Sequence, residues 1–168
     1  MFKEVNIEEF SVMKFSFFHG NGKGVVLCAG DGEKSNAMTI GWGDFGTLWN
    51  QPAVSVYVAQ KRYTHALMEK TRYFTVMYFA DDAVPLYMGS HSGRDGDKAK
   101  ALGLTTLFTE NGTPYYAEAE KVIECKIMYK DIFHPDCFMD SVPQKFYDGF
   151  QAGLHSVYVG KVVRIMEK

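Results

Sequence analysis

The run at residues 36–49 reads NAMTIGWGDFGTLW and combines strand-forming residues with three glycines and two tryptophans. Glycine lets a ligand approach the backbone closely, and the side chains of Asn36 and Thr39 can hydrogen-bond the polar edge of a heterocycle. The indole faces of Trp42 and Trp49 can stack on such a ring or wall it. The same pattern is also typical of a glycine-rich bend whose tryptophans fill a core, and both interpretations stand at this point.

A second segment, Arg62-Tyr63-Thr64, follows an apolar run and is predicted to begin a helix. A guanidinium, a hydroxyl and free backbone N–H groups then meet where the helix dipole is positive, which suits a phosphate. The alternative is a surface arginine beside an N-capping threonine.

A third segment reads SGRDGDK, and Ser92 and Lys98 bracket its glycine-containing turn. Such a turn can cradle an anion. The alternative is a solvated helix start in which Arg94 and Lys98 pair with Asp95 and Asp97, an arrangement that adds little stability.

The elements that must position these residues are mostly strands. Segments rich in Val, Ile, Tyr, Phe and Thr recur between turn residues, which predicts a mainly β, antiparallel domain with a few helices. The predicted strands are Gly24–Ala29, Ala37–Trp42, Ala53–Val58, Tyr73–Phe79, Lys121–Tyr129 and His155–Ile165. Asp31-Gly32 predicts a hairpin between the first two, and we expect the last two to pair and close a barrel.

Two short helices are predicted between the strands. One spans Thr64–Thr71 with Thr64 as its N-cap, and the other spans Asp95–Leu102 and stops at Gly103. The segment Asp131–Gly153 carries two prolines and two glycines, so we expect a long loop or lid there.

Composition limits the class of protein. The 168 residues suit one domain, residues 1–168, with 46% apolar and 23% charged residues and no apolar stretch long enough to span a bilayer. The first residues lack a long apolar segment, so we expect no secretion signal and a cytoplasmic protein. A net charge of −2 gives no overall field attractive to nucleic acid.

The three cysteines, Cys28, Cys125 and Cys137, are widely spaced and odd in number, which favours reduced thiols over a disulfide framework. His134 and Cys137 stand three apart and could share a metal. No second His/Cys pair accompanies them, so a polar loop is the better interpretation and we expect no metal site.

Taken in order, the NAMTIGW segment, then Trp49 and Pro52, then Arg62-Tyr63-Thr64 and the SGRDGDK segment resemble the flavin reductase-like family, specifically its flavoredoxin-like members. The resemblance covers Asn36 to Val163. It implies a homodimeric split β-barrel of Greek-key-like topology that binds FMN near the dimer interface.

The resemblance also implies roles for particular residues. Asn36, Ala37, Met38, Thr39 and Trp42 match the family's segment facing the isoalloxazine ring. The residues that match its phosphate site are Arg62, Tyr63, Thr64, Ser92 and Lys98.

His155 lies in LHSVYVGKVV, which looks like the final strand of related flavin reductases, where a histidine lines the nicotinamide side of the flavin. It is the candidate catalytic residue. A histidine at the start of a strand is otherwise most often a satisfied polar residue.

These residues predict an FMN-dependent oxidoreductase in which NADH or NADPH reduces the flavin. Electrons would then pass to oxygen, ferric iron, free flavin or a partner protein. No GxGxxG follows a strand, so the nicotinamide would have to stack directly in the flavin cleft. An FMN-binding electron carrier without NAD(P)H activity is the first alternative. A β-barrel that binds single-stranded nucleic acid is the second, and the 15% aromatic content is its main support.

Overall fold

The computed structural model describes residues 3–5 and 24–168. The expectation that the first residues form no secretion signal therefore lies largely outside the described residues. The strands are β1 (Lys3–Glu4), β2 (Val25–Gly30), β3 (Ser35–Ile40), β4 (Gly43–Leu48), β5 (Gln51–Ala59), β6 (Tyr73–Tyr78), β7 (Thr106–Phe108), β8 (Pro114–Tyr116), β9 (Lys121–Ile132) and β10 (His155–Glu167). The helices are α1 (Tyr63–Met68), α2 (Ala83–Ser90), α3 (Lys98–Ala101) and α4 (Ser141–Asp148), with a short 3-10 turn, η3 (Pro135–Cys137).

The main sheet is a single antiparallel path in the order β3-β2-β6-β9-β10-β5-β4, and β1 adds to β10. The prediction of a mainly β fold with few helices is confirmed. The place of β9 and β10 differs from expectation, because this pair lies in the middle of the path instead of closing a barrel. Among the described strands, none pairs β3 with β4, the two ends of the path.

The central strands are apolar on both faces because each face covers a separate core. From β2, Leu27 joins a cluster that contains Phe74 and Tyr158 on one side of the sheet. Its neighbour Cys28 joins the second cluster, beneath α2 and α3, which contains Met88. Strand β3, which carries part of the site described below, pairs with β2 along its full length and is therefore anchored to these cores.

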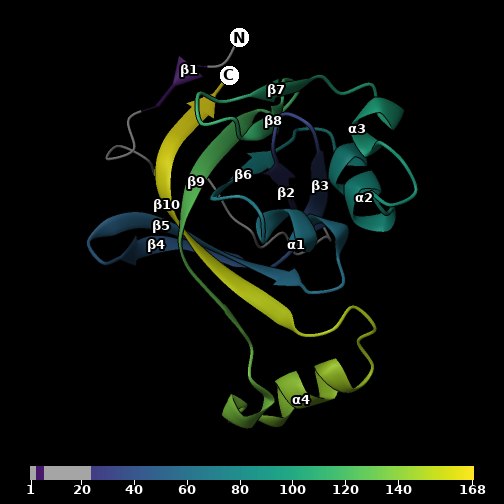
Figure 1. Cartoon of the computed structure of the whole chain (residues 1–168), viewed down its shortest axis with the longest axis vertical. Helices are drawn as coiled ribbons and strands as arrows, with labels where there is room; N and C mark the ends of the chain where they lie inside the picture. The colour runs from purple at the N-terminus through teal and green to yellow at the C-terminus, as the bar shows by residue number, and fades with distance from the viewer. Residues whose placement is uncertain (1–2, 6–23) are drawn as a thin grey trace.

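Figure 1 shows β9 and β10 as two long curved strands that run from the end near both termini to α4 at the opposite end. No helix in residues 3–5 and 24–168 is long and apolar enough to cross a membrane.

The predicted hairpin between β2 and β3 is confirmed, and its turn has a clear cause. The Asp31 carboxylate accepts hydrogen bonds of 2.9 Å from the backbone N–H groups of both Glu33 and Lys34. Strand β4 was not predicted. It is an edge strand with two glycines and largely exposed side chains, so it lacks the apolar alternation that marks a buried strand.

The predicted helices were partly wrong. The first begins at Tyr63 with Arg62 at the N-cap, and Thr64 is not its cap because its hydroxyl accepts a hydrogen bond from Asn36 instead. The second is only Lys98–Ala101 and is capped by the Asp97 carboxylate, which accepts from the Lys100 N–H. Helix α4 occupies part of the segment that was expected to be a loop.

Candidate functional site

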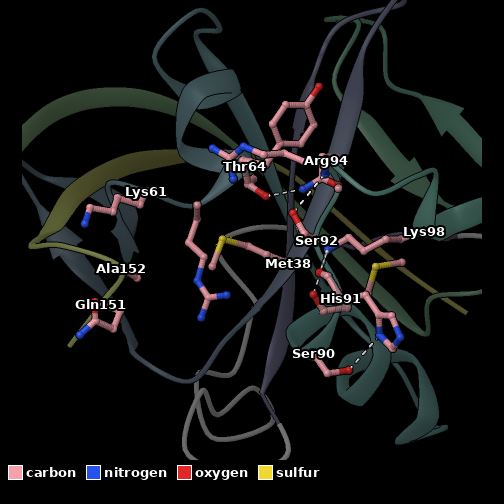
Figure 2. A pocket seen from close by; sticks show the side chains of 15 residues that line it. Met38, Lys61, Thr64, Ser90, His91, Ser92, Arg94, Lys98, Gln151 and Ala152 are labelled. Atoms are coloured by element: carbon pink, nitrogen blue, oxygen red, sulfur yellow. Dashed lines mark hydrogen bonds between the residues drawn. The ribbon is translucent and has the colours of Figure 1, made fainter. Parts of the chain in front are cut away.

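A cavity of about 340 Å³ lies between β3, the turn before α1, the loop after α2 and residues 151–152. Its cationic residues are Lys61, Arg62, Arg94 and Lys98, and none of the described residues that line it is acidic. The whole chain carries a net charge of −2, so the cavity is positively charged although the protein as a whole is negative. We call it the cation cavity. Figure 2 shows Lys61, Gln151 and Ala152 on one side of it and Ser90, His91, Ser92 and Lys98 on the other.

Three elements are joined at the wall of the cation cavity. The Asn36 amide on β3 donates a buried 2.7 Å hydrogen bond to the Thr64 hydroxyl on α1. The loop after α2 packs against this pair through Gly93, where an added Cβ would collide with the Asn36 amide oxygen and lie 2.7 Å from Cδ1 of Tyr63. Glycine is therefore required at this close approach, and the cavity wall has little freedom to move.

Arg94 also lines the cation cavity, although its sequence context predicts only a surface partner for acids. Its backbone N–H donates to the Ser92 hydroxyl at 3.1 Å, and its guanidinium lies 5.6 Å from the centre of the Tyr63 ring. A guanidinium held against an aromatic face keeps its N–H groups at the edge for an anion. An arginine in a turn near a predicted anion site was the signal that could have identified it.

Lys98 lines the cavity as predicted, but its hydrogen bonds serve the loop. The side chain is buried, and Nζ donates to the carbonyl oxygens of Met88 at 2.9 Å and His91 at 3.1 Å. Burial and the nearby Arg62 cation lower the pKa of Lys98 to about 8. Lys98 thus shapes the cavity and adds a positive charge that is sensitive to pH.

The side chains of β3 alternate between the cavity and α2. Asn36 and Met38 line the cation cavity, whereas Ala37 is fully buried in the core beneath α2 and the Thr39 hydroxyl donates to the Pro85 carbonyl of that helix. Any contact that Ala37 makes with a ligand is therefore through its backbone. The hydroxyl proton of Thr39, which was expected to serve a ligand, is used within the protein.

A smaller cavity of about 140 Å³ adjoins the first, and we call it the aromatic cleft. Met38 and Arg62 line both cavities. The other lining residues are Thr39, Ile40, Gly41, Trp42, Tyr57, Ala59, Phe146, Phe150 and His155. A polar, cationic chamber thus leads into a narrow one walled by rings.

His155 lies at the centre of the ring contacts of the cleft. Its ring centroid is 4.8 Å from that of Trp42 and 5.3 Å from that of Phe150, which stacks on it. Its Nδ1 lies 2.8 Å from the Tyr147 hydroxyl on α4. Burial, with a smaller contribution from the Arg62 cation, lowers the pKa of His155 to about 4, so the imidazole is neutral at pH 7.

Neither Trp42 nor Trp49 is buried in a core. The interpretation of residues 36–49 as a glycine-rich bend whose tryptophans fill a core is therefore wrong. Trp42 is 41% exposed and lies against Phe146 at 5.1 Å, at the edge of the cleft. Trp49 is 60% exposed in the turn between β4 and β5, contacts Tyr129 and is not among the residues lining either cavity. A role for Trp49 in stacking on a ligand of the same chain is thus not supported.

The cysteines lie outside both cavities. Cys28 and Cys125 are buried, and burial raises the pKa of each thiol, that of Cys28 to about 12. Cys137 is exposed in η3, and all three are free thiols.

The flavin reductase like domain family matches this chain over residues 18–168. The FMN-binding protein from Thermus thermophilus with bound 1-cyclohex-2-enone is 26% identical and matches with a TM-score of 0.64, covering 85% of this chain and 68% of that chain. Flavoredoxin of Desulfovibrio vulgaris is 19% identical, with a TM-score of 0.66 over 86% of this chain and 68% of its own. The NADH:FAD oxidoreductase of Streptomyces globisporus is 18% identical, with a TM-score of 0.63 over 87% and 76%.

No curated protein matches the sequence. The family match spans most of the chain, and the solved structures share its antiparallel sheet with few helices. The chain therefore belongs to the flavin reductase-like domain family.

Proposed function

We propose that this protein binds FMN and catalyses reduction of the bound flavin by NADH or NADPH. The observation that carries the proposal is the joining of the cation cavity to the aromatic cleft through Met38 and Arg62. FMN has the complementary form, with a dianionic phosphate at one end and a flat ring with polar edges at the other.

The residues fit both ends of this cofactor. Lys61, Arg62 and Arg94 would hold the phosphate by charge-assisted hydrogen bonds, in a cavity whose described lining has no carboxylate to repel it. The ring would lie along β3, where Met38 faces the cavity. The larger cavity also lies within the range of roughly 300–1,000 Å³ that is common for small-molecule sites.

When bound, FMN supplies the hydride-accepting chemistry, so no nucleophilic side chain is needed. The rings of Trp42, Phe146 and Phe150 would exclude water from the reacting region, because they wall the cleft on the side of α4. His155, neutral at pH 7, would offer hydrogen bonds without adding a charge beside the ring.

Similar proteins support the assignment in part. The Thermus thermophilus relative is described as FMN-binding, and the Streptomyces globisporus protein as an NADH:FAD oxidoreductase.

We also propose assembly as a homodimer, which sedimentation velocity would test.

One observation favours an electron carrier as the second candidate. The aromatic cleft measures only about 140 Å³ and is walled by Phe146 and Phe150, so a nicotinamide could enter beside a flavin only if α4 moved. In a carrier, α4 would stay in place and a partner protein would deliver the electrons.

The deciding experiment is anaerobic mixing of the FMN-loaded protein with NADH or NADPH while flavin absorbance is followed. Rapid bleaching with either nucleotide supports the reductase. Flavin that stays oxidised until dithionite is added supports the carrier. Protein that retains no FMN after incubation with excess cofactor contradicts both candidates.

A further inference from the structure

Tyr147 of α4 makes a hydrogen bond and a ring contact with His155 of β10. Its hydroxyl lies 2.8 Å from Nδ1 of the imidazole. The two rings are 5.8 Å apart. A hydroxyl on α4 thus contacts the side chain of the candidate catalytic residue on the sheet.

The chemistry of the two groups decides which of them donates. A phenol O–H is a stronger donor and a weaker acceptor than a neutral imidazole, so the Tyr147 hydroxyl donates to Nδ1 across the 2.8 Å contact. Burial raises the pKa of Tyr147, which keeps the hydroxyl protonated at neutral pH. A neutral imidazole that accepts at Nδ1 must carry its one proton on Nε2.

The groups that face His155 favour the same neutral form. Arg62, from the turn before α1, places a cation beside the ring and opposes its protonation. Tyr57 of β5 also lines the cleft, and burial and its hydrogen bond to Asp44 raise its pKa to about 12, so it remains uncharged.

We propose that Tyr147 is a positioning residue that fixes His155 as the Nε2–H tautomer, so that His155 presents an N–H donor to a carbonyl group of a ring bound in the aromatic cleft. Only the identity of that ring, a flavin or a nicotinamide, rests on the proposed function. Because Tyr147 belongs to α4, the helix sets the proton position of a residue on the sheet.

The test compares the chain with Tyr147→Phe and with Tyr129→Phe. The first variant removes the hydroxyl but keeps the ring, which stacks on Phe138 at 5.7 Å. The second is the matched control, because Tyr129 donates to Asp131 on an exposed surface and lines neither cavity.

The readout is the two ring nitrogens of His155 in the cofactor-free protein labelled with ¹⁵N-histidine, with His155→Gln to assign the signals. The parent and the Tyr129→Phe control should show the Nε2–H pattern, with a titration midpoint well below 6.5. Tyr147→Phe should show a mixture of tautomers and a higher midpoint. An Nδ1–H pattern in the parent, or an unchanged tautomer in Tyr147→Phe, would overturn the proposal.

A second measurement separates this proposal from the proposed function. In FMN-loaded protein, Tyr147→Phe should slow reduction by about tenfold and change FMN affinity by less than about twofold, since one hydrogen bond of ordinary strength is lost. If the protein binds no FMN but the nitrogen spectra behave as expected, only the proposed function fails. If Tyr147→Phe does not fold, the tautomer of the parent alone decides.

Discussion

The cation cavity and the aromatic cleft are neighbours that are held in different ways. The cavity is built on β3 and α1, which the Asn36–Thr64 hydrogen bond joins, and on a loop that packs against them at Gly93, so its wall belongs to the body of the fold. The cleft depends on α4, which lies at the far end of β9 and β10 (Figure 1). Its contacts with the rest of the fold include that of the Phe146 ring with Trp42.

This difference suits the two regions to different tasks. Charges on a rigid frame suit tight retention of a cofactor, because little ordering is needed on binding. A helix held by ring contacts and one tyrosine hydroxyl can move at lower cost, which suits the passage of a second substrate. Three substitutions or conditions test whether the two regions act separately.

The largest effect is expected from Arg62→Ala, because Arg62 lines both regions. FMN affinity should fall by about 10- to 100-fold, as a hydrogen bond to a charged group contributes roughly 1.5–3 kcal/mol. The pKa of His155 should also rise, since the Arg62 cation helps to lower it. Fluorescence titration of FMN and NMR titration of His155 measure the two effects.

Lys130→Ala is the matched control for Arg62→Ala, since it removes one positive charge from an exposed ion pair with Glu69. It should leave both quantities unchanged. A shifted His155 pKa with unchanged FMN affinity in Arg62→Ala would show that the phosphate binds elsewhere.

An intermediate effect, confined to the cation cavity, is expected from pH. The pKa of Lys98 is about 8 in the free protein, and a bound phosphate favours the charged amine, so binding raises that pKa. FMN affinity should therefore fall as pH rises from 7 to 9, by up to about tenfold, while the phosphate itself stays dianionic. Titrations across this range measure the slope.

The comparison variant for the pH series is Lys98→Met, which removes the amine and keeps much of the side-chain volume. Its FMN affinity should be lower than that of the parent and flat between pH 7 and 9. An equal slope in both proteins would assign the titration to another group.

The smallest effect on cofactor binding is expected from Phe146→Ala, which loosens only the cleft. It removes ring contacts with Trp42 at 5.1 Å and Phe150 at 4.8 Å, each of which contributes about 0.5–1.5 kcal/mol beyond burial. Limited proteolysis near α4 should become faster, while FMN affinity changes by less than about threefold.

Val142→Ala lies on the same helix and alters a side chain that is 71% exposed, so it should leave the proteolysis rate unchanged. If Phe146→Ala weakens FMN binding as much as Arg62→Ala does, the two regions are not separable.

The sequence was most informative where local chemistry decides the structure. The Asp31 turn and the apolar runs of β2, β5, β6, β9 and β10 were predictable, since a carboxylate beside free N–H groups and burial on a sheet act over a few residues. The two glycines and exposed side chains of β4 gave no comparable signal.

Two of the wrong predictions have long-range causes, and one has a local cause. Thr64 is a sound N-cap by local rules, but Asn36, 28 positions earlier, takes its hydroxyl. Lys98 was predicted to contact a phosphate, with a surface ion pair as the alternative, but tertiary packing directs its amine to the carbonyls of Met88 and His91. Helix α4 was not predicted, because Pro143 is typical of a helix break. Proline is tolerated in the first turn of a helix, and Asp140 caps this one.

Strand β3 has one consequence for the behaviour of the protein in solution. Among the described strands it pairs only with β2, so it is an edge strand of the described sheet, with α1 and α2 packed against it. Such an edge is a template on which another polypeptide can add. A heterocycle bound along β3 would block the addition of such a strand. Aggregation after removal of that compound should therefore begin at β3.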